Sequence, residues 1–140
     1  MKPDRRSMKR GHAAVEMALI APWILFLFAG AFDMGIYAQC LIATANAARV
    51  AALYTSSSAS AATDSVGACR YALAELKTMP NVKNLTSCGT DPLVVSAALV
   101  SGPDGLPATQ VTVVYQTPQL IPIPGLKGRF RISRSAQMKL

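Results

Sequence analysis

An uncharged apolar run near the N-terminus constrains this chain more than any other feature. The run extends from Met17 to Phe32, sixteen residues without a charged side chain. One carboxylate, that of Glu16, stands at its head, five residues after Gly11. An ionisable residue at the centre of a bilayer costs about 2.5 kcal/mol or more. Glu16 is therefore a candidate functional residue.

The length of this segment matches a membrane. Residues 12–32 make a helix of about 31 Å at 1.5 Å per residue, close to the roughly 30 Å hydrocarbon core of a bilayer. The helical pattern continues beyond Asp33, because residues 33–54 are rich in alanine and keep a helical periodicity. The sequence therefore predicts one helix from about His12 to about Tyr54, with its first half transmembrane and its second half outside the membrane.

The net charge of +7 is divided between the two ends of the chain. The first basic cluster precedes the apolar run, and the second lies in the last fourteen residues (Lys2, Arg5, Arg6, Lys9 and Arg10; Lys127, Arg129, Arg131, Arg134 and Lys139). Lys and Arg beside a membrane span keep that end in the cytoplasm. Because no nucleic-acid-binding module surrounds either cluster, we expect no nucleic-acid partner. The charge pattern predicts a cytoplasmic N-terminus and an exported remainder.

Three cysteines fit an exported domain. Cys69 and Cys88 both follow the predicted span and are candidates to form a disulfide, since disulfides persist outside the cytoplasm. Such a bridge would contribute roughly 3 kcal/mol in the chain-entropy description. Cys40 is then left over on the long helix, either as a small buried apolar residue or as an intermolecular crosslink.

Residues 55–140 read as a small α+β head. A Ser-rich linker at 55–60 precedes a second helix at about Ala62 to Met79, which Pro80 stops. Strands are expected at Leu93–Val100, Thr109–Gln116 and Arg129–Arg134, and the turn residues of 101–107 predict a hairpin between the first two. The Pro-rich segment Leu120–Leu126 is expected either to cross over the sheet or to present apolar side chains to a partner.

The sequence offers little for catalysis. It contains one histidine, no CxxC or Cys/His cluster and no Gly-rich phosphate loop after a strand. We therefore expect no enzyme activity, no metal and no cofactor. Arg49 is either a solvated helix residue or a residue that pairs with or caps the head where the helix meets it.

The motifs of the N-terminal third resemble a known family. Lys-Arg-Gly11 with glutamate at the fifth position after glycine is similar to the processing site of type IV pilin-like precursors. The segments Ala13–Pro22, Phe32–Gly35, Tyr37–Gln39 and Ala45–Arg49 further resemble the TadE-like minor pilins of tight-adherence (Flp) pilus systems. The resemblance covers about residues 8–54, with a weaker echo at 111–115 and 132–136. Met17 and His12 depart from it, because such precursors often place an aromatic residue and an apolar residue there.

The resemblance implies a fold, a processing site and partners. Residues 1–11 would be a leader, and a prepilin peptidase would cut between Gly11 and His12. Glu16 could then pair with the new amine of a neighbouring subunit, which offsets the desolvation of both charges. The implied product is a pilin-like subunit of the bacterial inner membrane with a periplasmic α+β head at 55–140. Its implied partners are other pilin subunits, the membrane and the inner-membrane pilus assembly platform.

Two other functions remain open from the residues. The basic start, the run Met17–Ala29 and Ala29-Gly30-Ala31 imitate a signal peptide cut after Ala31, which would release a soluble secreted protein. Alternatively, the chain could stay uncut as a bitopic inner-membrane scaffold. Glu16 within the apolar region and the helical pattern past Asp33 count against the signal peptide.

Overall fold

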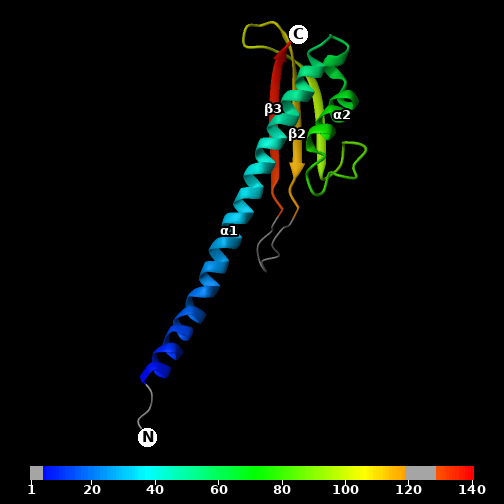
Figure 1. The fold of residues 1–140 in the computed structure, drawn as a ribbon. Coiled ribbons are helices and arrows are strands. Elements are labelled where there is room, and N and C mark those ends of the chain that lie inside the picture. Colours follow the sequence, from blue (N-terminus) through cyan, green and yellow to red (C-terminus); the bar gives the residue numbers. More distant parts are fainter. Residues whose placement is uncertain (1–4, 119–128) are drawn as a thin grey trace. The chain divides into compact units, whose positions relative to one another are not determined.

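The structure is a computed structural model that describes residues 5–118 and 129–140. The chain divides into two compact units, residues 1–36 and 37–140, which are described separately. The element order is α1 (Arg5–Thr55), η1 (Ala61–Thr63), α2 (Ser65–Leu76), β1 (Leu93–Ser101), β2 (Pro107–Gln116) and β3 (Arg131–Lys139). A long apolar N-terminal helix, a second helix and a three-stranded antiparallel sheet confirm the α+β, pilin-like fold class (Figure 1).

Helix α1 confirms the long N-terminal helix and corrects its start. It begins at Arg5, seven residues before the expected His12, and ends at Thr55. The basic residues before His12 are good helix formers, so nothing in their chemistry stops the helix at the edge of the apolar run. Pro22 lies inside α1, which spanning helices tolerate. The part of α1 from His12 to Thr55 is long and apolar enough to cross a membrane.

The sheet is a meander in the order β1-β2-β3. Strand β1 pairs with β2 from Leu93 opposite Tyr115 to Ser101 opposite Pro107, which confirms the predicted hairpin. Gly105, at a φ of 76°, supplies the left-handed residue that this turn needs. The buried positions of β2 alternate with half-exposed ones, as a strand with one covered face requires.

Two sequence-predicted elements have different bounds. The second helix covers Ser65–Leu76, because Asp64 caps its N-terminus and the separate turn η1 precedes it. The third strand covers Arg131–Lys139 and not residues 129–134, because it pairs with the whole of β2 from Gln116 to Ala108. That pairing continues over Ser-Ala-Gln, which carry little strand preference of their own. The Pro-rich segment Leu120–Leu126 lies outside the described residues.

The second half of α1 packs along the inner face of the sheet. The hydroxyl of Thr109 in β2 donates to Oγ1 of Thr55 at the end of α1, over 3.0 Å. Eighteen residues earlier, the ring of Tyr37 meets that of Phe130 edge-on, with centroids 5.6 Å apart. The eighteen helical steps from Tyr37 to Thr55 span about 27 Å. Phe130 lies opposite Thr117, whose N–H donates to its carbonyl. The eight strand steps from Thr109 to Thr117 also span about 27 Å. The helix therefore matches the length of the sheet that it covers (Figure 1).

The core of the second unit lies between this half of α1, α2 and the sheet. Small side chains of α1 are fully or almost fully buried there, which lets the helix backbone approach the strands closely (Cys40, Thr44, Ala47, Ala48, Ala51, Ala52 and Thr55). Tyr115, Leu76 and Leu93 are the largest fully buried side chains. The alanine-rich sequence after Asp33 thus has a packing role as well as a helical preference.

Candidate functional site

The predicted processing and assembly residues lie on one stretch of α1. Gly11 and His12 are both helical, and Glu16 follows one turn later. Nδ1 of His12 lies 3.8 Å from Oε1 of Glu16, at the i,i+4 spacing that brings side chains together on a helix. Both side chains are largely exposed, at 86% and 71%. The sequence analysis missed this contact, although the spacing of four residues could have revealed it.

The surroundings of Glu16 are apolar and uncovered. Large hydrophobic side chains with at least half of their surface exposed follow it along α1 in the first unit (Met17, Leu19, Ile20, Trp23, Ile24, Leu25, Phe26, Leu27, Phe28, Phe32 and Met34). They point in all directions around the helix, as expected for a segment that has an apolar solvent on every side. Glu16 is therefore the charged group at the entrance to a lipid-compatible surface.

Arg49, the predicted contact between helix and head, is exposed on α1. No hydrogen bond or ion pair joins it to another residue within 12–118 or 129–140. The contact between α1 and the sheet is instead made by buried, uncharged residues such as Thr55 and Ala52. A role for Arg49 at this contact stays a prediction.

The cysteines are arranged as the sequence analysis expected. Cys69 of α2 and Cys88 form a disulfide with their Cα atoms 5.8 Å apart. Cys40 is a free thiol, 1% exposed, with its sulfur 3.9 Å from that of Met79. Burial raises the pKa of the Cys40 thiol. The structure therefore supports the interpretation of Cys40 as a small buried residue.

A junction that the sequence analysis did not identify joins the end of α1 to the start of α2. One carboxylate oxygen of Asp64 accepts hydrogen bonds from the backbone N–H groups of Val66 and Gly67, and the other accepts from the hydroxyl of Tyr54 over 2.8 Å. The N–H of Gly67, followed by the Tyr54 hydroxyl, lowers the pKa of Asp64, while the same bond raises the pKa of Tyr54. An Asp before a helical apolar run is a capping signal that could have revealed this residue.

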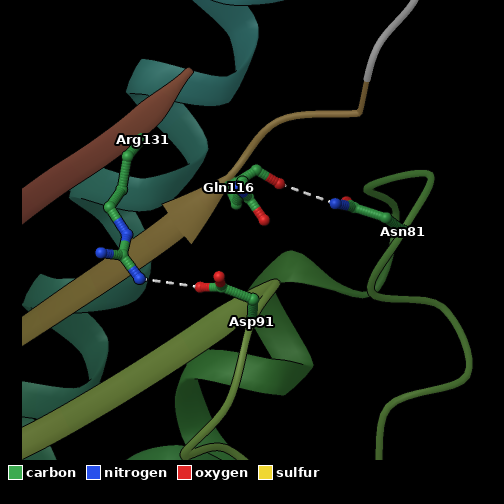
Figure 2. A network of polar contacts seen from close by, with 4 residues as sticks. All are labelled: Asn81, Asp91, Gln116 and Arg131. Atoms are coloured by element: carbon green, nitrogen blue, oxygen red, sulfur yellow. Dashed lines mark hydrogen bonds and ion pairs between the residues drawn. The ribbon is translucent and has the colours of Figure 1, made fainter. Parts of the chain in front are cut away.

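A second polar junction, shown in Figure 2, lies where β1 begins and β2 ends. The side-chain N–H of Asn81 donates to the carbonyl of Gln116 over 2.7 Å, and Nη2 of Arg131 lies 2.9 Å from Oδ1 of Asp91. The amide oxygen of Asn81 accepts the hydroxyl of Tyr115 at 2.6 Å. Burial raises the pKa of Tyr115. These bonds fasten the loops at this end of the sheet.

The described residues offer anchoring and docking groups. Among residues 12–118 and 129–140, no three His, Cys, Asp or Glu side chains gather closely enough to hold a metal ion. No fully buried side-chain nitrogen or oxygen among these residues lacks a hydrogen-bond partner.

Comparison with known proteins finds a family match for the N-terminal segment. Residues 11–53 match the family model described as TadE-like protein. The match begins at Gly11 and ends two residues before the end of α1, so it includes Glu16, the apolar run and the alanine-rich half of the helix. It confirms the resemblance over this segment. Searches of curated proteins and of solved structures found no match to the chain.

Proposed function

Because residues 11–53 are TadE-like, we propose that this chain is a minor pilin-like subunit associated with a tight-adherence pilus. It is inserted in the inner membrane with its N-terminus in the cytoplasm and its head in the periplasm, and it is trimmed between Gly11 and His12. Its role is structural, through contacts with other pilin subunits and with the assembly platform. The observation that carries the proposal is the single carboxylate, Glu16, five residues after Gly11 at the head of an exposed apolar helix.

The orientation rests on charge and on cysteine chemistry. The basic residues before His12 favour a cytoplasmic N-terminus. The disulfide between Cys69 and Cys88 suits an oxidising compartment such as the periplasm. Both features point to the same topology, although they come from opposite sides of the apolar run.

The chemistry of trimming requires a local change in α1. The bond between Gly11 and His12 lies within the helix, and a peptidase must unwind this part of the helix to reach it. Glycine is about 1 kcal/mol less favourable than alanine in a helix interior, so Gly11 lowers the cost of unwinding next to the bond. Cleavage then creates an α-amine at His12, one helical turn from Glu16.

The pairing partner of Glu16 follows from this cleavage. In the uncut chain, its carboxylate lies 3.8 Å from the His12 imidazole. In an assembled filament the carboxylate would be surrounded by apolar helices, where an uncompensated charge is costly. The new amine of a neighbouring subunit supplies the opposite charge.

N-terminal sequencing of the protein, purified from cells that contain a prepilin peptidase, tests the proposal. We expect the mature chain to start at His12. A Gly11→Leu variant should remain full length, whereas the matched Gly30→Leu variant should still be trimmed. A start at Phe32 would support the secreted alternative, and a full-length wild-type chain would support the bitopic alternative. Either result would contradict processing at Gly11.

A further inference from the structure

Among the described residues, one edge of the sheet has no strand beside it. In the sheet order β1-β2-β3, strand β3 is at the edge, and β2 is its one neighbour among the described strands. The N–H of Thr117 donates to the carbonyl of Phe130 over 2.9 Å, so these two residues form a hydrogen-bonded pair of the antiparallel ladder. In such a ladder, alternate residues bond the neighbouring strand and the residues between them face the other way.

The position of this hydrogen-bonded pair in the register identifies the backbone groups of β3 that are directed away from β2. Phe130, Ile132 and every second residue after them bond β2. The residues whose N–H and C=O groups face the open edge are Arg131, Ser133, Ser135, Gln137 and Lys139. Within the described part of the chain, no backbone hydrogen bond reaches these groups from another segment. The edge therefore presents five donors and five acceptors at intervals of about 6.8 Å.

The opposite edge of the sheet differs. On β1, the carbonyl of Leu93 accepts from Gly89, and the N–H of Leu93 donates to Thr90, each over 3.1 Å. Farther along, the N–H of Ala97 donates to Oγ of Ser65 at the start of α2 over 3.2 Å. The β1 edge is thus partly closed by the chain's own loop and helix. Within residues 5–118 and 129–140, an added strand has an uninterrupted row of partners along β3 and not along β1.

Charge determines what kind of strand fits there. Residues 129–140 contain four basic side chains and no acidic one. Arg131 pairs with Asp91 and Lys139 with Asp104, whereas Arg134, near the middle of β3, has no ion pair with another described residue. The open edge therefore carries an excess of positive charge.

The same charges disfavour a second copy of β3. An antiparallel β3–β3 pair with full overlap is centred on Ser135 and places Arg131 opposite Lys139 at both ends. Like charges directly opposite each other destabilise a strand pair, and basic residues are a common protection of edges against self-association. The complementary occupant is an acidic strand from another protein.

We propose that the β3 edge receives an extended acidic segment of a partner protein as a fourth strand. Backbone hydrogen bonds to the outward-facing groups of Ser133 and Ser135 supply the affinity, as in strand addition generally. Arg134 and its basic neighbours select for acidic side chains. The interaction goes beyond the proposed pilus role and does not depend on trimming at Gly11.

Binding of a designed peptide to the full chain in detergent micelles tests this inference. The probe is a fluorescent nine-residue peptide that alternates glutamate and threonine, and its neutral counterpart replaces each glutamate with glutamine. We expect the acidic peptide to bind at least about threefold more tightly than the neutral one. Amide hydrogen exchange at Ser133 and Ser135 should slow when the acidic peptide binds.

Proline variants separate the two edges. Ser135→Pro removes an outward-facing donor while leaving the β2 ladder intact, because proline is tolerated where the N–H faces away from the sheet. It should weaken binding of the acidic peptide about tenfold, which corresponds to the loss of about one hydrogen bond. The matched Leu99→Pro variant removes an outward-facing N–H from β1 and should not change the affinity. Hydrogen exchange at Val113 verifies that both variants keep the sheet.

Four results would overturn the inference. In the first two, the acidic peptide does not bind, or the neutral peptide binds as tightly as the acidic one. In the third, Ser135→Pro and Leu99→Pro lose the same amount of affinity for the acidic peptide. In the fourth, the unliganded chain associates with itself and Ser135→Pro abolishes this association. The last result would assign the edge to a second copy of this chain. Light scattering of the micelle-bound protein measures it directly.

Discussion

Asp64 shows how much of the head depends on one carboxylate. It caps α2 through Val66 and Gly67 and holds the hydroxyl of Tyr54. The ring of Tyr54 in turn stacks on Tyr71, with centroids 4.7 Å apart. The end of α1 and the start of α2 are therefore joined by a charge, a cap and an aromatic pair, all within residues 54–71.

We expect Asp64 to make stability depend on pH. Because its pKa is lowered in the folded state, its stabilising effect is present above the unfolded value, about 3.9, and is lost as the pH falls through the folded value. Thermal unfolding of Asp64→Asn, followed by near-ultraviolet circular dichroism of the tyrosines, should occur below the wild-type temperature at neutral pH. The difference should shrink below about pH 4.

The control for this measurement is Glu75→Gln. Glu75 is an exposed carboxylate of α2, and no hydrogen bond joins its side chain to another described residue. This variant should show the wild-type pH dependence. A difference between Asp64→Asn and wild type that stays constant from neutral pH to about pH 2.5 would contradict the linkage to the Asp64 charge.

Gly67 is a second residue on which this junction depends. A Cβ at this position would collide with the ring of Tyr54 and with Oδ2 of Asp64. Gly67→Ala should gain about 1 kcal/mol of helix preference and lose about 1–3 kcal/mol to overpacking. We therefore expect a net loss in the free energy of unfolding, measured by denaturant titration of the full chain in detergent.

The reason for this loss can be tested in a second background. With Tyr54→Ala, the ring is absent, and the collision that remains is with Oδ2 of Asp64, which must stay in place to cap α2. Gly67→Ala should then destabilise the chain less than it does in the wild-type background, because one of the two collisions is removed. An equal loss in both backgrounds would show that Tyr54 is not the cause.

Among the elements, α2 depends most on a covalent tie. The helix has twelve residues, near the limit at which isolated helices are marginal. Its disulfide from Cys69 to Cys88 closes a loop with a sequence separation of 19. The bridge fixes α2 to the segment that leads into β1, on the side where Ser65 bonds Ala97.

Replacing both cysteines, as in Cys69→Ser with Cys88→Ser, should lower the free energy of unfolding by about 3 kcal/mol. Denaturant titration of the full chain measures the loss. Cys40→Ser is the matched control for thiol chemistry, because reducing agent should destabilise this variant and wild type alike while leaving the double variant unchanged. A double variant as stable as the oxidised wild type would contradict a structural role for the bridge.

For the molecule as a whole, the proposed assembly depends on Glu16. Glu16→Ala should still insert in the membrane, because it removes a carboxylate from the head of the apolar run. In a filament, it should leave the partner's amine unpaired, at a cost of about 3–5 kcal/mol. We expect the variant in the membrane fraction and a strong depletion from sheared filaments, measured by quantitative immunoblotting.

Asp33→Asn is the matched control, since it removes the other carboxylate of α1 beyond the same apolar run. It should enter filaments at the wild-type level. Unaltered incorporation of Glu16→Ala would contradict the pairing mechanism, even if N-terminal sequencing had confirmed trimming at His12.

The features that could be predicted from the sequence are those that depend on residues close together in the chain. The apolar run, the alanine-rich continuation of α1 and the turn residues between β1 and β2 each act over neighbouring positions, so their elements were predicted with small errors. The pairing of Cys69 with Cys88 was accessible because only these two of the three cysteines fall in the head, residues 55–140. The end of β3 was wrong, because Ser135 to Lys139 become a strand through pairing with β2 and not through their own preference.

The sequence alone thus determined the membrane-compatible helix, the position of Glu16 after Gly11 and the α+β class of the head, because periodicity, charge and turn chemistry are written along the chain. Only the tertiary structure decided which surfaces remain free. The bond from Thr109 to Thr55, the bond from Tyr115 to Asn81 and the open edge of β3 join or expose residues far apart in sequence. Such contacts depend on how packed elements meet, and no local pattern records them.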